Sequence, residues 1–287
     1  MREYKIVTDS TVDLPRDFLD EKEIVVIEMS YVIEGVTYYE NTGLSHKEFF
    51  DKLRAGAVAT TSQINPKEAR TVLEPIIKEG KDILYIGFSS GLSGSFNSVR
   101  LAACDLQEEY PETKIITIDS LCASTGEGLL LYKAIELKEQ GKTIDETAQW
   151  VEENKLHICH NVTVDDLHHL HRGGRISKTS AVIGTMVKIK PIIHMNNEGR
   201  LCVIGKERGR KKSLNTLINR MEKQMEGYEN PIVMIAHGDC EEDALYVKKM
   251  IEERFEIHNI LISEFGSVIG SHTGPGVIAV FFMGKER

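Results

Sequence analysis

Short apolar runs alternate with amphipathic segments along the first half of the chain. Apolar runs bounded by turn residues are typical of buried strands, whereas apolar positions three or four residues apart predict helices. The expected strands are 4–10, 23–33 (one strand or a strand pair), 83–86 and 114–120. The expected helices are one that begins near Pro15 and those at 44–56, 65–80, 95–107, 126–140 and 144–154. This alternation favours a mostly parallel sheet with helices on both faces.

The second half is less regular, but its pattern predicts a second α/β unit. The expected strands are 156–164, a pair within 191–205 that turns at Asn-Glu-Gly, 231–239, 259–265 and 277–284. Helices are expected at 165–171 and 241–254. A chain of 287 residues, 41% of them apolar, is more consistent with two packed domains than with one. We therefore predict an N-terminal α/β domain over 1–155 and a C-terminal α/β domain over 156–287.

Charge and cysteine content narrow the class of protein. The formal net charge is −9, and basic residues cluster only at 171–178 and 206–212, which disfavours general binding of nucleic acid. These two clusters fit either a solvated surface or a docking patch for an acidic partner. Five scattered cysteines without a C-x-x-C pair indicate a reduced, cytoplasmic protein. No apolar run approaches the roughly 20 residues of a membrane span, and the N-terminus does not resemble a signal peptide.

Short polar groups follow three of the predicted strands, at 9–10, 89–90 and 119–120. Ligands of open parallel sheets bind at the carboxyl ends of the strands, so these groups are expected near a site. Each one alone also fits an ordinary turn or helix cap.

The loop at 87–95 is the strongest candidate for a binding site. It lacks the Lys of a nucleotide-binding P-loop and the G-x-G-x-x-G of a dinucleotide loop. Its frame Gly91-Leu-Ser93-Gly-Ser95 also lacks the last glycine of a hydrolase elbow. What remains is a cup of hydroxyl and backbone N–H groups at a helix N-terminus, suited to a small anion such as a carboxylate. A serine hydrolase or acyltransferase that uses Ser93 with His272 stays open as an alternative.

Two further patterns suggest other chemistry. The segment 8–13, TDSTVD, is similar to the motif of aspartate-based phosphatases, but Thr11 replaces the second carboxylate, so a helix cap is favoured. His and Cys residues gather at 157–171 without the spacing of a zinc site, so we expect no metal there.

Seven motifs in order along the chain resemble the DegV family. They are VTDSTVDLP (7–15), TSQ (61–63), SSGLSGSFNS (89–98), IDS (118–120), LHRGGRIS (170–177), KPI (190–192) and GSHTGPG (270–276). This resemblance implies a bacterial protein that binds a long-chain fatty acid such as palmitate in a buried tunnel. The tunnel is expected to have its polar end near the interface of two α/β domains. Characterised members serve as the acyl-carrying subunit of a fatty-acid kinase, so the resemblance implies an ATP-dependent, dihydroxyacetone-kinase-like partner and no catalytic residue, metal or cofactor of its own.

The resemblance also assigns residues to the site. The implied ligand-binding residues are Thr61, Ser62, Ser93, Gly94 and His272, with Thr61 and Ser93 hydrogen-bonded to the carboxylate. Arg172 and Arg175 are the implied contacts with the kinase subunit. This sequence has Ile64 and Ser95 where the family commonly has Pro and Thr, which puts the stiffness of these loops in doubt more than the class of ligand.

Overall fold

The computed structural model describes residues 2–177 and 189–287. In the first half, four strands form a parallel sheet in the order β2-β1-β6-β7, with the two central strands buried. They are β1 (Tyr4–Asp9), β2 (Val25–Ile27), β6 (Asp82–Gly87) and β7 (Ile115–Asp119). The parallel sheet predicted from the alternating pattern is confirmed.

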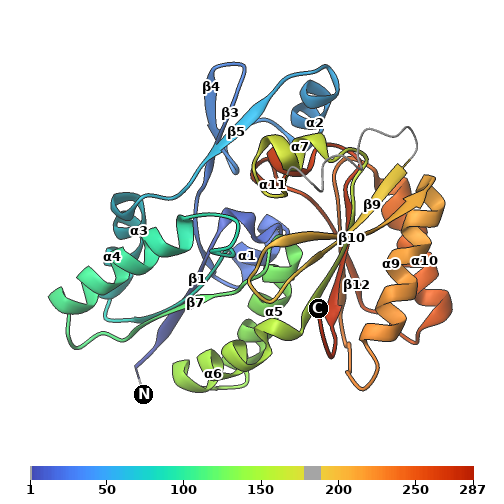
Figure 1. The fold of residues 1–287 in the computed structure, drawn as a ribbon. Coiled ribbons are helices and arrows are strands. Elements are labelled where there is room, and N and C mark those ends of the chain that lie inside the picture. Colours follow the sequence, from blue (N-terminus) through green and yellow to red (C-terminus); the bar gives the residue numbers. More distant parts are fainter. Residues whose placement is uncertain (1, 178–188) are drawn as a thin grey trace.

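Helices cover both faces of this sheet (Figure 1). One pair is α3 (Pro66–Lys78) with α4 (Ser95–Glu109), and the other is α5 (Thr125–Glu139) with α6 (Ile144–Asn154). The start of α3 follows from its sequence, because Asn65 and Glu68 form a capping box and Pro66 takes the first helical position. The short helices η1 (Ser10–Val12) and α1 (Arg16–Glu21) follow β1.

A small antiparallel sheet, β4-β3-β5, projects from the first half (Figure 1). It comprises β3 (Ser30–Ile33), β4 (Val36–Tyr39) and β5 (Ala59–Ser62), with α2 (His46–Arg54) between β4 and β5. The predicted strand or strand pair at 23–33 is therefore a pair, whose members β2 and β3 belong to different sheets. The sequence pattern predicts no strand at 59–62, because four residues are too few to show alternation; this strand exists through its pairing with β3.

The second half is built on a six-stranded sheet in the order β10-β9-β8-β13-β11-β12. Its strands are β8 (Ile158–Thr163), β9 (Ile189–Met195), β10 (Leu201–Arg208), β11 (Val233–His237), β12 (Ile260–Glu264) and β13 (Ile278–Met283). All neighbours are antiparallel except β11 and β12. The predicted hairpin within 191–205 is confirmed as β9–β10.

The helices of the second half are α7 (His168–Arg172), α9 (Arg210–Gln224), α10 (Glu241–Arg254) and α11 (Ser267–Thr273), with η2 (Lys155–His157) before β8. The sequence pattern predicts neither α9 nor α11. Helix α9 starts with charged residues, so its apolar face is not evident from the sequence pattern. That face comprises Leu214, Leu217, Ile218 and Met221. In α11 the pattern fails because nearly every residue is buried, so no polar face marks it as a helix.

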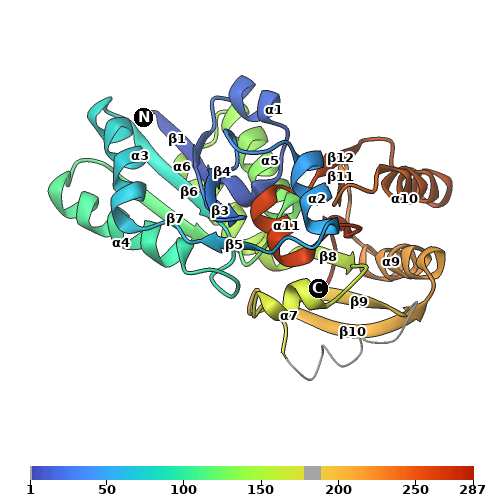
Figure 2. The same ribbon diagram turned by 90° about the horizontal axis from the view of Figure 1, so that it is seen from above.

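Helix α5 joins the two halves. It contacts β6 of the first sheet and β8, β11 and β13 of the second, lies between the two halves (Figure 2), and has most of its residues buried. The predicted domain boundary at 155/156 falls between α6 and β8 and remains a prediction. Within the described residues, no helix has both the length and the apolar character needed to cross a membrane.

Candidate functional site

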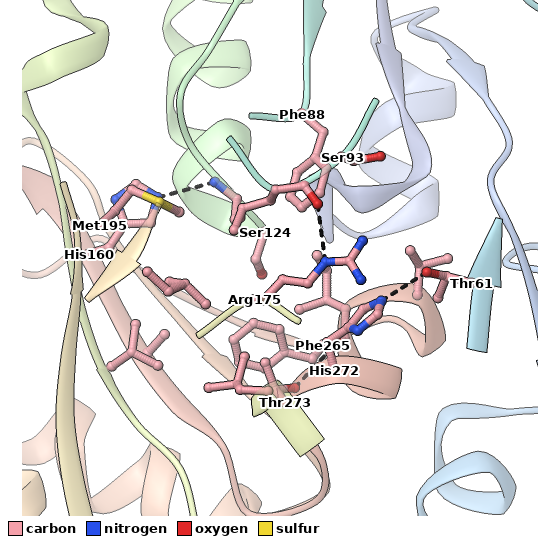
Figure 3. A pocket seen from close by; sticks show the side chains of 18 of the residues that line it. Thr61, Phe88, Ser93, Ser124, His160, Arg175, Met195, Phe265, His272 and Thr273 are labelled. Carbon is pink, nitrogen blue, oxygen red and sulfur yellow. Dashed lines mark hydrogen bonds between the residues drawn. The ribbon is translucent and has the colours of Figure 1, made fainter. Parts of the chain in front are cut away.

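A cavity of about 300 Å³ lies between the two halves of the chain, with lining residues from both. Its apolar lining comprises Met29, Phe88, Leu92, Ala123, Val162, Val164, Leu170, Ile193, Met195, Leu201, Phe265, Val268, Ile269, Ala279 and Phe281. Figure 3 shows Thr61, Arg175 and His272 together at one side, whereas His160 and Met195 lie at the other. The cavity is therefore an apolar chamber with one polar end.

The loop at 88–94 is held by carboxylates at the ends of β1 and β7. Asp9 Oδ2 accepts a hydrogen bond from the N–H of Phe88 at 2.9 Å, and Asp119 Oδ1 accepts one from the N–H of Ser90 at 3.1 Å. Asp9 also accepts from the N–H of Thr11 at 3.2 Å, which confirms that the segment 8–13 forms a helix cap. The polar groups at these strand ends shape the loop rather than line the cavity.

The same loop packs against the turn between β9 and β10. Ser89 Oγ donates a hydrogen bond to the carbonyl of Gly199 at 2.7 Å. A Cβ atom at position 91 would lie 2.5 Å from the carbonyl oxygen of Glu198, so only glycine fits there. The loop of the first half and the hairpin of the second therefore enclose the cavity together.

Ser93 lines the cavity at the start of α4. Its Oγ accepts a hydrogen bond from the N–H of Ser95 at 3.2 Å and lies 3.0 Å from Ser95 Oγ. Among the described residues it forms no hydrogen bond with His272. The serine-hydrolase alternative, which requires Ser93 and His272 to act as a pair, gains no support from this geometry.

Thr61 and His272 meet at the polar end. Thr61 Oγ1, on β5, and His272 Nε2, on α11, are joined by a hydrogen bond of 2.8 Å. Burial, together with the nearby charges of Arg175 and Arg172, lowers the pKa of His272 to about 4, so its ring is neutral at pH 7. Its Nδ1 is buried and has no hydrogen-bond partner among the described residues. The polar end therefore holds a neutral imidazole with one unused nitrogen.

The packing of His272 explains why one of the two residues between Arg172 and Arg175, Gly173, is a glycine. A Cβ atom on Gly173 would lie 2.2 Å from His272 Nδ1. The absence of a side chain thus lets the imidazole approach the backbone that follows α7.

Arg175, which the resemblance implies as a contact with the kinase subunit, lines the cavity, a position that the sequence pattern does not predict. It is half-buried and lines the cavity, where Nε donates to the carbonyl of Leu92 at 3.1 Å and Nη1 donates to that of Gly173. Burial lowers the pKa of Arg175 below its usual value, but an arginine remains charged at pH 7. The cup expected to contain only neutral donors therefore includes a cation. This placement follows from the fold of residues 173–176, where the N–H of Arg175 bonds the carbonyl of Leu170 and Ile176 is buried.

The other predicted site residues lie around this end. Gly94 lines the cavity, and a Cβ atom there would meet the amide of Gln63 at 2.2 Å. Ser62 is exposed on β5, pairs in register with Ser30 and does not line the cavity. Arg172 is exposed, and its Nη2 lies 3.0 Å from His169 Nδ1.

His160 is a wall residue that the sequence pattern does not single out. The N–H of Ala123 donates to its Nε2 at 3.2 Å, so the ring proton is on Nδ1, which donates to the carbonyl of Ile158 at 3.0 Å. Burial, followed by the charge of Arg287, lowers the pKa of His160 to about 3. With both nitrogens bonded and the ring edge-on to Phe281, His160 presents carbon atoms to the cavity.

The His and Cys residues at 157–171 do not come together at one site. His157 Nδ1 bonds Tyr228 and the carbonyl of Gly284, and Cys159 donates to the carbonyl of Glu286. Over the described ranges, no group of three or more His, Cys, Asp or Glu residues could hold a metal ion.

Comparison with known proteins places this architecture in a family. A family model described as an uncharacterised protein of the DegV family matches residues 3–285. A DegV domain-containing protein of Clostridium perfringens is 44% identical over 289 residues, covering 100% of this chain and 99% of the relative.

Two solved structures have the same fold. A DegV family protein of Thermus thermophilus, described by its fatty-acid binding, is 29% identical with a TM-score of 0.89, covering 99% of this chain and 100% of that one. DegV of Bacillus subtilis, described as a fatty-acid-binding protein, is 29% identical with a TM-score of 0.85 and the same coverage. The match of the family model over nearly the whole chain, together with the relative at 44% identity, shows that the chain belongs to the DegV family.

Proposed function

We propose that this protein binds a long-chain fatty acid, with the acyl chain in the cavity and the carboxylate at the polar end. The observation that carries the proposal is the cavity itself, which is apolar along its walls and polar at one side. The fatty-acid binding of the Thermus thermophilus and Bacillus subtilis relatives supports the same ligand class.

The apolar walls supply most of the binding energy. Each methylene moved from water into such a wall contributes about 0.8 kcal/mol, so a chain of about fourteen methylenes contributes far more than its head group. His160 does not interrupt this surface, because both of its ring nitrogens are bonded to backbone groups.

The polar end then selects a carboxylate. Buried carboxylates are stable only where donors or a cation offset the loss of water. Here the hydroxyls of Thr61 and Ser93 and the guanidinium of Arg175 provide donors and a positive charge. His272 Nδ1 adds a buried ring nitrogen without a partner.

We further propose that the bound acid is presented to a separate, ATP-dependent kinase subunit that phosphorylates the carboxylate to an acyl phosphate. Arg172 supports this step, because it is exposed on α7 close to the polar end and can contact a partner without touching the acyl chain. In this proposal the chain acts as a cytoplasmic carrier that holds the substrate and does not itself catalyse the reaction.

Mass spectrometry of the purified protein under native conditions tests acyl binding. We expect a bound mass equal to a long-chain fatty acid, released by organic solvent. A protein that neither retains nor takes up any fatty acid would exclude the proposal.

The carrier role is tested with a dihydroxyacetone-kinase-like subunit, ATP and the loaded protein. Arg172→Ala is expected to leave acyl affinity unchanged and to slow acyl phosphate formation. Arg100→Ala, an exposed arginine on α4, is the matched control. Loss of acyl affinity in Arg172→Ala would place Arg172 in the lipid site instead.

A further inference from the structure

The second sheet carries another hollow, on the face of β9 opposite the acyl cavity. Ile193 and Met195 line the acyl cavity, whereas His194 between them lines a hollow of about 570 Å³. This follows from strand geometry, since successive side chains point to opposite faces. The opposite wall is α9, which packs against β9 and β10 (Figure 1).

Three cations line this hollow: Arg220, Lys223 and Arg287. Within the described residues, Arg220, Lys223 and Arg287 form no ion pair, although Arg210 and Lys212 at the start of α9 pair with carboxylates at 2.8 Å. Glu286 is the one acidic residue among those that line the hollow. The local charge is therefore positive on a chain whose net charge is −9.

Arg220 is positioned to meet a ligand. It is half-buried, and its Nε donates to Asn161 Oδ1 at 3.2 Å. Over the described ranges its two terminal amino groups have no hydrogen-bond partner. Burial lowers the pKa of Arg220, and no carboxylate opposes that shift. A half-buried guanidinium with two unused donors is an incomplete arrangement that an anion would complete.

Two buried nitrogens at the same hollow are also unpaired. His194 Nδ1 and Arg287 Nε have no hydrogen-bond partner within the described part of the chain. The terminal nitrogens of Arg287 donate to the carbonyls of Leu121, Asn196 and Lys155, so its guanidinium is fixed in place. Buried polar atoms without partners are rare because the loss of water is not repaid, which points to a bound ligand or ordered water.

We propose that this hollow binds a phosphate group, carried by a small phosphate ester or by a phospholipid headgroup. Guanidinium groups match the geometry of phosphate oxygens with two parallel hydrogen bonds, and Lys223 adds a point charge at the exposed rim. A phosphate monoester has three terminal acceptor oxygens, against two on a carboxylate, and carries more negative charge, so it can engage more donors at once. The volume of about 570 Å³ leaves room for the organic part of the ester.

The site is tested by titrating the protein with inorganic phosphate and with phenyl phosphate. Binding is measured by calorimetry and by the ¹⁵N chemical shift of Arg220 Nε. We expect saturable binding in a chloride background and a shift of that resonance. Arg220→Gln and Lys223→Gln are each expected to weaken binding about tenfold or more, since each removes a charge-assisted hydrogen bond. Arg100→Gln, at an exposed arginine on α4 that forms no ion pair among the described residues, should change nothing.

The proposal would be overturned if phosphate binding were not saturable, or if neither Arg220→Gln nor Lys223→Gln changed the affinity. Lys223 is exposed, so Lys223→Gln keeps the test valid should Arg220→Gln disturb the fold through the lost bond to Asn161. Co-sedimentation with phosphatidylcholine vesicles, with and without phosphatidic acid, separates the two sources. Binding to phosphatidic acid that Lys223→Gln weakens assigns a lipid headgroup, whereas binding of phenyl phosphate alone assigns a soluble ester.

Discussion

Arg175 offers the sharpest test of how the polar end recognises its ligand. Its guanidinium is half-buried in the cavity wall and bonds only backbone carbonyls, those of Leu92 and Gly173, among the described residues. A fatty-acid carboxylate at this end would be its first anionic partner. Replacement by Gln keeps an amide donor and removes the charge.

The size of the effect follows from the type of bond. Hydrogen bonds to charged groups contribute about 1.5–3 kcal/mol, and about 1.4 kcal/mol corresponds to a tenfold change in affinity. Arg175→Gln is therefore expected to raise the Kd for a long-chain fatty acid by about 10- to 100-fold. The corresponding fatty alcohol carries no charge, so its Kd should change far less.

The assay compares the two ligands by displacement of a fluorescent fatty acid from wild type and variant. If the substitution loosens the loop that Arg175 bonds, both affinities fall by a similar factor, and the ratio of acid to alcohol affinity does not change. A fall in that ratio supports the role of Arg175 in binding the head group. An unchanged ratio, with both ligands weakened equally, would show that Arg175 holds the loop and does not touch the carboxylate.

Three further predictions concern the same cavity. Thr61→Val and Ser93→Ala should each weaken fatty-acid binding by about 1.5–3 kcal/mol, measured by calorimetry, because each removes a donor to a charged group; unchanged affinity in both would place the carboxylate elsewhere. Gly173→Ala should raise the Kd for fatty acid and lower the melting temperature, since its Cβ would lie 2.2 Å from His272 Nδ1; retention of wild-type values would show that the imidazole moves freely. His160 has a pKa of about 3 in the fold, against 6.5 as its ordinary value, so the unfolded chain takes up its proton first as the pH falls. The free energy of unfolding should therefore decrease between pH 6.5 and pH 4, and urea titrations should show a shallower decrease in His160→Gln; identical slopes would contradict the assigned pKa.

The fold of the first half could be predicted because its strands and helices carry local signals. Asn65, Glu68 and Pro66 mark the start of α3 before any tertiary contact is considered. Elements that lack such signals were not predictable. In α11, six of the seven residues are buried, so its periodicity has no polar side to display. Strand β5 is four residues long and is defined by pairing with a strand about thirty positions earlier.

The candidate site could be predicted in part. Thr61, Ser93 and His272 lie at one cavity although they are far apart in sequence, and it was the family motifs, rather than local patterns, that connected them. Phe88, His160 and Phe265 were not predictable as wall residues, because an apolar or aromatic residue in or just after a strand gives no sign of which cavity it faces.

Arg175 shows most clearly why the position of a side chain can be impossible to predict from local sequence. An arginine beside glycines in a polar segment is expected at the surface, and Arg172, three residues earlier, is indeed exposed. The two differ because α7 ends between them: Gly174 adopts φ +75°, and the chain turns back so that Arg175 enters the cavity while Arg172 faces solvent. The position of one charge, and with it the change from a neutral cup to a cationic one, is thus set by a single turn. This turn also brings Gly173 against His272, so the cation and the neutral imidazole are placed by the same few residues.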